Sequence, residues 1–188
     1  MTQLHERTTV SAHPFAAQLS VFPTELGWFA LVGADDRLTL ITIGHDSERD
    51  ARKAAQRKMQ ARLAFDQHDW SPSFRERLQD YARGVEVDFV DLKIDFPDRT
   101  RFQRSVIAAT RRIPWGATRT YGQLAQSAGS PRAARAVGSV MAANRFPIIV
   151  PCHRVVGAGG RLGGFSAPQG VTLKQRMLEL EGGWQRSR

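Results

Sequence analysis

The chain has 188 residues, of which 41% are hydrophobic and 24% are charged, and its formal net charge is +9. This is the composition of an ordinary globular protein, long enough for one large domain or two modest ones. No apolar run approaches the roughly 20 residues of a membrane span, and residues 1–23 lack the basic start and apolar stretch of a secretory signal, so we expect a cytoplasmic protein that does not cross a membrane.

The N-terminal part has the pattern of a small β-sheet with helices. Gly27 to Gly33 and Leu38 to Gly44 are β-branched and aromatic runs separated by a polar turn, which predicts a hairpin. Residues 47–65 and 73–82 have helical spacing. Val85 to Ile94 alternates apolar and polar residues, which predicts a third strand.

The character of the sequence changes near residue 97. Thr100 to Arg112 predicts an amphipathic helix, and shorter helices are expected at Tyr121 to Ala128 and at Arg132 to Ala143, where Pro131 is placed to open the second. The tight turn between these two gives helix-turn-helix spacing, in which the second helix enters a groove of DNA. The sequence therefore predicts an α+β protein whose C-terminal part is mostly helical.

The positive charge lies in this C-terminal half. Residues 1–96 hold 12 Lys and Arg against 15 Asp and Glu, a balance of −3, whereas residues 97–188 hold 15 against 3, a balance of +12. Such a basic block attracts a polyanion, because neutralised phosphates release their counterions. An anionic membrane is the weaker interpretation, since there is no basic amphipathic helix with a bulky apolar face. Nucleic acid is the predicted partner.

Cys152, the only cysteine, lies within the apolar run Ile148 to Val156. The neighbouring His153 and Arg154 are expected to lower the pKa of its thiol and so make it a nucleophile. A buried structural cysteine is the alternative, and it is the commoner role of a lone cysteine. We expect no metal site, because there is no second cysteine and the other histidines lie far away in the sequence.

The glycines between residues 157 and 164 raise the question of a cofactor. Their spacing misses the dinucleotide-binding pattern, since Leu162 stands where the third glycine should be. We expect a flexible loop there and no cofactor.

Several residues together carry a resemblance to a known family. They are Arg135-Ala136-Val137-Gly138, Asn144, Pro147 to Val155 with its PCHRV core, Gly163 to Ser166, Lys174 and Glu181. Over about residues 97–182 the chain resembles an O6-alkylguanine-DNA alkyltransferase. The resemblance implies direct-reversal DNA repair, in which the alkyl (methyl) group of O6-alkylguanine in double-stranded DNA is transferred irreversibly to the protein's own cysteine. Each molecule would act once, as a monomer and without a cofactor.

The resemblance also implies roles for single residues. Cys152 would be the nucleophile, and Glu181, His153 and a water molecule would draw off its proton. Tyr121 would crowd the adjacent DNA phosphate and donate a proton to the departing guanine. Asn144 would tie together the turns around the sulfur.

The DNA contacts implied by the resemblance lie on the second helix of the helix-turn-helix unit. Arg135 would replace the flipped-out base from the minor groove, and Ala136 and Gly138 would allow close approach. The implied substrate pocket consists of Met141, Pro147, Val155, Phe165 and Ser166, with the Ser166 amide binding O6 and the carbonyls of Cys152 and Val155 accepting from the exocyclic amine. Arg132, Arg145 and Arg154 are expected to be phosphate contacts or surface charges.

This interpretation divides the chain at residues 96 and 97. Residues 1–96 would form an N-terminal domain of ribonuclease H-like outline without an assigned role, and residues 97–188 the DNA-binding and catalytic domain. Two alternatives stay open. One is a non-catalytic relative that only binds alkylated DNA, against which the presence of Cys152 argues. The other is a plain helix-turn-helix regulator that reads sequence and ignores damage.

Overall fold

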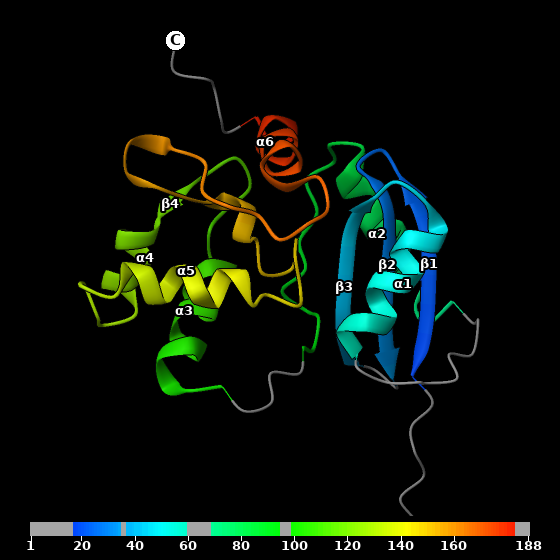
Figure 1. Ribbon diagram of the computed structural model, residues 1–188, viewed down its shortest axis with the longest axis horizontal. Helices are drawn as coiled ribbons and strands as arrows, with labels where there is room; N and C mark the ends of the chain where they lie inside the picture. Colours follow the sequence, from blue (N-terminus) through cyan, green and yellow to red (C-terminus); the bar gives the residue numbers. More distant parts are fainter. Residues whose placement is uncertain (1–16, 35–36, 60–68, 95–98, 183–188) are drawn as a thin grey trace, which may run out of the picture.

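The protein consists of two halves that lie side by side, a sheet with its helices and a mostly helical part (Figure 1). The structure, a computed structural model, describes residues 17–34, 37–59, 69–94 and 99–182. The predicted α+β class is confirmed. In the described part of the chain, no helix is long and apolar enough to cross a membrane.

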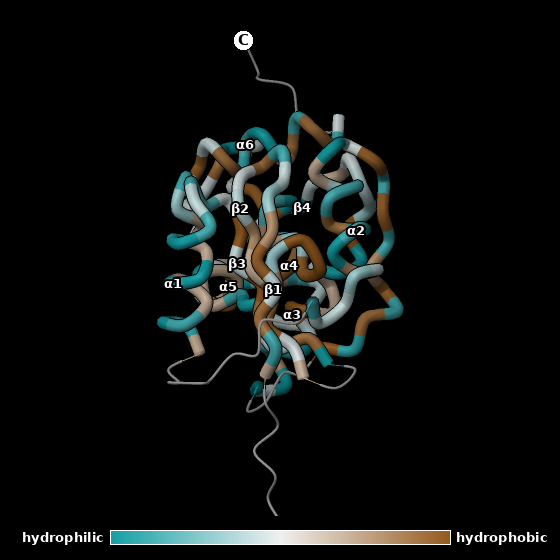
Figure 2. Tube along the Cα trace, turned by 90° about the vertical axis from the view of Figure 1, so that its right-hand side faces the viewer, coloured by the Kyte–Doolittle hydropathy of each residue, from teal (hydrophilic) through white to brown (hydrophobic). Residues whose placement is uncertain are grey.

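The sheet of the N-terminal half has three antiparallel strands in the order β1-β2-β3. They are β1 (Gln18–Thr24), β2 (Gly27–Ala34) and β3 (Arg37–His45). Helix α1 (Glu48–Met59) lies on one face of the sheet, and α2 (Pro72–Ala82) lies on the other (Figure 2). This arrangement leaves β3 as the edge strand that faces the C-terminal half (Figure 1).

The strand expectations had mixed outcomes. The hairpin formed by β2 and β3 is confirmed, although its turn includes residues 35–36, which lie outside the described residues. Strand β1 was missed, because it contains Pro23 and polar residues; proline is tolerated there since β1 is an edge strand. Residues 60–65 of the first predicted helix also lie outside the described residues.

The predicted strand at residues 85–94 is wrong. Its alternating pattern does not reflect pairing with a neighbouring strand. It reflects burial of Phe89, whose ring packs edge-on against Phe74 with 5.8 Å between the ring centroids. Arginine side chains donate to the carbonyls of this segment, with Arg77 bonding Asp88 and Arg111 bonding Phe89. An isolated bridge between Leu38 and Ile94 links the end of the segment to β3.

Four helices form the framework of the C-terminal half. They are α3 (Arg101–Arg111), α4 (Tyr121–Ser127), α5 (Ala134–Ala142) and α6 (Gly170–Leu180). Two short strands, β4 (Arg119–Thr120) and β5 (Val155–Val156), pair in parallel, and one-turn helices lie at η1 (Cys152–Arg154) and η2 (Ala158–Gly160). Reciprocal capping boxes start α3 and α4, where Thr100 and Thr120 accept from the amides of Gln103 and Gln123.

The two helices of the predicted helix-turn-helix unit, α4 and α5, are present and pack on each other. Helix α5 begins at Ala134, two residues later than expected, so Pro131 lies in the turn and does not open the helix. In the apolar run Ile148 to Val156, only Val155–Val156 is a strand, and Cys152 begins a one-turn helix.

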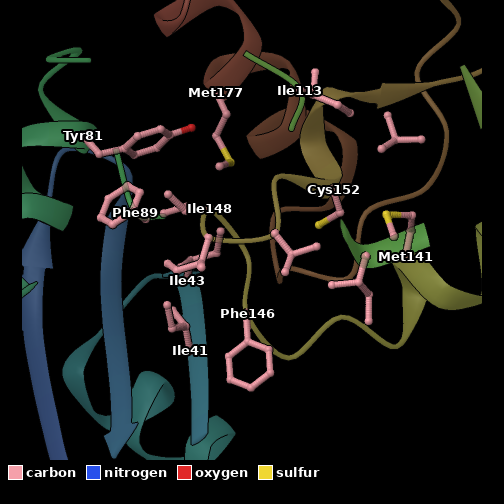
Figure 3. Close-up of a cluster of buried hydrophobic side chains, with 14 of the residues drawn as sticks. Ile41, Ile43, Tyr81, Phe89, Ile113, Met141, Phe146, Ile148, Cys152 and Met177 are labelled. Atoms are coloured by element: carbon pink, nitrogen blue, oxygen red, sulfur yellow. The ribbon is translucent and has the colours of Figure 1, made fainter. Parts of the chain in front are cut away.

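One buried cluster extends through both halves. Tyr81 and Phe89 of the N-terminal half belong to the same cluster as Met141, Cys152 and Met177 of the C-terminal half (Figure 3). Backbone contacts add to this packing, since the amide of Ile41 on β3 donates to the Arg145 carbonyl at 2.9 Å. The predicted boundary at residues 96 and 97 lies within residues 95–98, outside the described part.

Candidate active site

Cys152 is the first residue of η1, and only 6% of its surface is exposed. The side chain of Asn144 fixes its position. The Asn144 amide nitrogen donates to Cys152 Sγ at 3.1 Å and to the Val150 carbonyl at 2.8 Å, while its oxygen accepts from the amide of Phe146 at 3.0 Å. The three bonds connect α5 to the turn before the cysteine, so the direction of the sulfur is set by the fold.

The turn before Cys152 contains a strained residue. Ile148 has a φ of 75°, the left-handed region that a β-branched residue rarely adopts. Such a conformation costs roughly 1–3 kcal/mol and persists only where the surroundings impose it. Here Ile148 is buried in the shared cluster, and the amide of Val150 closes the turn on the Phe146 carbonyl at 2.8 Å.

Glu181 lies at the C-terminal end of α6 and is the centre of a buried polar network. Its Oε1 is 2.7 Å from His153 Nε2 and accepts from the Tyr81 hydroxyl at 2.9 Å. The guanidinium of Arg154 donates to both carboxylate oxygens, at 2.8 and 2.9 Å. All four side chains are buried, so the carboxylate has the donors that a buried charge requires.

The expectation that Arg154 is a phosphate contact or surface charge is wrong. Only 9% of this residue is exposed, and its third nitrogen donates to the Ile113 carbonyl at 2.6 Å. The bidentate pairing with Glu181 uses the planar guanidinium as a fixed fork. Arg154 therefore holds the Glu181 carboxylate in place inside the protein.

The ionisation of Glu181 follows from these contacts. Burial alone would raise the pKa of its carboxyl, but hydrogen bonds from His153 and Arg154 and the positive charge of Arg154 outweigh burial and lower the pKa to about 2. Burial, with the Glu181 charge next, raises the pKa of Tyr81 well above its usual value. The network thus consists of a carboxylate and a neutral phenol that donates to it.

The thiol of Cys152 differs from the sequence expectation. Burial raises its pKa, and this effect outweighs the lowering by the Asn144 hydrogen bond and by the charge of Lys174. His153 and Arg154 do not activate the resting thiol, because both side chains turn toward Glu181. Cys152 is therefore a protonated thiol at neutral pH, and its proton must be removed for it to react.

His153 is suited to remove that proton. Burial lowers the pKa of the His153 ring below its usual value, so the imidazole is neutral. We assign its proton to Nε2, which faces Glu181 Oε1 and lies 3.1 Å from the Tyr81 hydroxyl. Nδ1 then carries a free lone pair, and it is buried without a hydrogen-bond partner among the described residues.

A cavity of about 430 Å³ opens on Cys152 from the side of α4 and α5. Its lining includes six residues of the predicted site, namely Tyr121, Gly138, Met141, Cys152, Phe165 and Ser166. Burial raises the pKa of Tyr121, so its phenol keeps its proton. A side chain at Gly163 would come within 2.8 Å of the Tyr121 hydroxyl, which explains the glycine at that position.

The exposed face of α5 carries the predicted DNA contacts. Arg135 and Ala136 are exposed, and Gly138 is half-buried. An added Cβ at Gly138 would meet no atom within 4 Å, so the missing side chain is not required for packing inside the protein. The bare surface of α5 is therefore available for close approach from outside.

The two other predicted pocket residues lie elsewhere. Pro147 lines a second cavity that also reaches Cys152. Val155 is fully buried and lines neither of the two cavities at Cys152. Its carbonyl accepts from the buried ammonium group of Lys174 at 2.6 Å, which leaves one of its two lone pairs for a further donor.

Tyr81 is the site residue that sequence reasoning missed. It contacts Glu181, which is 100 residues away in the sequence, and it comes from the half of the chain without a recognised motif. Tyr81 is one of the buried residues of α2, but helical spacing cannot show which residue its hydroxyl will meet. No group of three or more His, Cys, Asp or Glu that could hold a metal occurs among the described residues.

Comparison with known proteins gives concordant results. Residues 101–183 match the sequence profile described as "6-O-methylguanine DNA methyltransferase, DNA binding domain". A methylated-DNA–protein-cysteine methyltransferase of Methanosarcina acetivorans is 46% identical over 112 residues, which cover 58% of this chain and 69% of that protein.

Two solved structures resemble the fold over both halves. The structure of Mycobacterium tuberculosis OGT in complex with DNA is 33% identical, with a TM-score of 0.71, and covers 87% of this chain and 92% of its own. The O6-methylguanine-DNA methyltransferase of Pyrococcus kodakaraensis is 27% identical, with a TM-score of 0.70. The match covers 88% of this chain and 99% of that protein's chain.

Proposed function

This chain belongs to the family of methylated-DNA–protein-cysteine methyltransferases, and from that premise we propose how it repairs DNA with its own residues. The function is direct reversal of O6-alkylguanine damage, by transfer of the alkyl group from the base to Cys152. One observation carries the assignment to this cysteine. Cys152 is the chain's single thiol, and it lies at the cavity formed with α5 of the helix-turn-helix unit.

The first step is removal of the thiol proton. Through a bridging water, Nδ1 of His153 accepts the proton from Cys152, and the carboxylate of Glu181 stabilises the imidazolium that results. Asn144 donates a hydrogen bond to the sulfur and stabilises the thiolate. The thiol is activated only when this proton is drawn away, so a buried cysteine of raised pKa is protected from other electrophiles until the substrate is in place.

The second step is the displacement. The thiolate attacks the alkyl carbon in line with the bond to O6, so a sulfur–carbon bond forms and the carbon–oxygen bond breaks. Its electron pair goes to the guanine, and the protonated phenol of Tyr121 donates to N3. The amide of Ser166 binds O6. Because a thioether is not hydrolysed under physiological conditions, each molecule acts once.

DNA is the partner, and access to the base requires that the nucleotide leave the stack. We propose that Arg135 on α5 fills the gap in the duplex from the minor groove, while Ala136 and Gly138 let the helix approach closely. We further propose that the protein acts as a monomer in the cytoplasm and needs no cofactor, since the alkyl acceptor is its own side chain.

The test uses a duplex whose O6-methylguanine carries a radiolabelled methyl group. We expect the label on the protein in the parent and none in Cys152→Ser. An excess of undamaged duplex should weaken binding of the protein to the O6-methylguanine duplex only slightly, because the protein prefers the lesion. Binding of the lesion without transfer would instead support the non-catalytic alternative, and indifference to the lesion would support the helix-turn-helix regulator.

A further inference from the structure

A second cavity, of about 330 Å³, reaches Cys152 from the side of the N-terminal half. One wall comes from edge strand β3 and from the last turn of α1, and the other comes from Pro147 and residues 165–168. Cys152, Phe165 and Ser166 line both this cavity and the one that opens toward α5. The two cavities therefore adjoin at the sulfur.

Two buried polar atoms, on residues that line this cavity, are without hydrogen-bond partners among the described residues. They are Thr42 Oγ1 and His45 Nε2, and their residues are only 3% and 6% exposed. A buried polar group without a partner destabilises the folded protein, so such a group beside a cavity calls for a partner from the cavity, either a water molecule or a polar group of a ligand. Burial, and then the charge of Lys58, lowers the pKa of His45, so its neutral ring can carry a proton on Nε2 and donate it.

Two cations complete the wall. Arg57 and Lys58, in the last turn of α1, line the cavity and have no ion-pair partner among the residues that the structure describes. The charge of Lys58 also acts on the Cys152 thiol, since it is one of the charges that lower the pKa of that thiol. Two cations, a hydroxyl and an imidazole N–H are all donors, and together they fit an anionic oxygen group.

The transfer reaction shows what could bring an anion there. In an in-line displacement the sulfur, the carbon and O6 are collinear, so any further atoms of the alkyl group must project sideways from that line. With guanine in the cavity on the α5 side, the adjoining cavity of the N-terminal half lies open to such a side group.

We propose that this second cavity binds the far end of O6 substituents larger than methyl, and that Arg57, Lys58, Thr42 and His45 select substituents that end in a carboxylate. The inference rests on the proposed function and gives the N-terminal half a role in substrate selection. The chemical step is unchanged. Sγ bonds the carbon next to O6, the carbon–O6 bond breaks, guanine takes up a proton in place of the one lost by the thiol, and the carboxylate stays intact.

The test compares three duplexes that differ only in the O6 group: methyl, carbamoylmethyl and carboxymethyl. The last two have nearly the same shape and differ in charge. Single-turnover rate constants are measured for the parent and for the double variant Arg57→Met/Lys58→Met. The matched control is Arg49→Met/Lys53→Met, which removes the same charges from exposed positions on the same helix, outside the cavity.

We expect the ratio of the carboxymethyl rate to the carbamoylmethyl rate to fall about tenfold in the cavity variant, because a charge-assisted contact is lost. The matched variant should keep the parental ratio. An unchanged ratio in the cavity variant overturns the proposal. An equal fall for all three duplexes also overturns it, since the cations would then act on the DNA backbone or on the thiol. A parent that transfers no methyl group contradicts the proposed function itself.

Thr42→Val supplies a second, independent variant of nearly identical shape. Removing an unpaired buried hydroxyl should raise the melting temperature, whereas losing the donor should lower the same rate ratio. A higher melting temperature with an unchanged ratio would show that this hydroxyl does not contact the substituent, and would overturn its assignment to the site.

Discussion

Single side chains at this site owe their ionisation to their contacts. Glu181 is buried yet charged, His153 is buried and neutral, and Cys152 is buried and protonated. The differences arise because Arg154 and Tyr81 donate to the carboxylate, while the sulfur accepts its hydrogen bond from the neutral side chain of Asn144. These are the protonation states that the proposed proton transfer from sulfur to imidazole starts from, with the negative charge of Glu181 beside the imidazole.

These ionisations predict how stability depends on pH. Glu181 has a pKa of about 2 in the folded protein against 4.5 ordinarily, so its contribution is complete above about pH 4.5 and is lost as the pH falls toward 2. The shift corresponds to a contribution of Glu181 to the free energy of unfolding on the order of 3 kcal/mol. The pKa of His153 is also lowered, so the unfolded chain takes up that proton first, and stability begins to fall below about pH 6.5.

Glu181→Gln should therefore unfold more easily than the parent at pH 7 and show a flatter loss of stability in acid. Urea unfolding between about pH 7 and pH 3 measures both effects. Asp91→Asn is the control, because Asp91 is an exposed carboxyl whose pKa is lowered by a hydrogen bond from Arg77. Equal pH dependence in parent and Glu181→Gln would mean that Glu181 is not the charged centre of the network.

Tyr81→Phe tests the contribution of the N-terminal half to the chemistry. The ring should stay packed on Trp115, at a centroid distance of 5.4 Å, while the hydroxyl bond to Glu181 is lost. We expect transfer to slow by about three- to tenfold and stability to fall by roughly 1–3 kcal/mol. Glu181 would then interact more strongly with the His153 ring and raise its pKa. Because the reaction needs the neutral ring, the midpoint of the pH profile of the rate should move upward. A lower stability with unchanged rate and pH profile would make Tyr81 purely structural.

The predictability of these residues from sequence was uneven. The PCHRV segment, Asn144 and Glu181 were found by resemblance, because the chemistry needs those residue types in that order. The roles of Arg154 and Tyr81 were not found, since each depends on which buried group the folded chain brings opposite them. A charge beside a cysteine in sequence need not face the sulfur in space.

Among the secondary-structure elements, α5 combines a packed side with a bare one. Gly138 is the clearest test, because an added methyl group would meet nothing inside the protein. Gly138→Ala should stabilise the helix by roughly 0.5–1 kcal/mol and at the same time weaken DNA binding, since the methyl group keeps the helix from the duplex. Thermal unfolding and a fluorescence binding titration measure the two effects. A variant that binds DNA as tightly as the parent would remove Gly138 from the interface.

Helices were predicted better than strands. The predicted helices of the described part correspond to α1 to α5 within two or three residues at the ends that are described, because amphipathic spacing and caps are local signals. Strand β1 was missed and residues 85–94 were wrongly assigned, because a strand exists only where another strand pairs with it. That partner is a property of the fold and not of the segment.

The protein as a whole joins an acidic half to a basic half through one buried cluster. The charge balance was readable from sequence, whereas the contact between the halves was not, because it depends on long-range pairs such as Ile41 with Arg145. The two halves therefore contribute different parts of the site. The basic half binds the polyanion, and the acidic half contributes Tyr81 to the network and one wall of the second cavity.

This division predicts how salt affects DNA binding. Arg132 is exposed in the turn just before α5, and its loss in Arg132→Ala should reduce the slope of log affinity against log salt by about one. Arg83→Ala removes an exposed arginine from the other half, where it pairs with Asp80, and should leave the slope unchanged. Equal slopes for both variants would show that the charge asymmetry does not direct binding.

The central claim is that Cys152 is consumed by the reaction. Peptide mass spectrometry after incubation with excess O6-methylguanine duplex tests it most directly. We predict a gain of one methylene's mass on the peptide with Cys152, on no other peptide, with one guanine restored per protein molecule and no more. An unmodified Cys152 in a sample that has restored guanine, or repair that continues beyond one guanine per protein, would contradict the account.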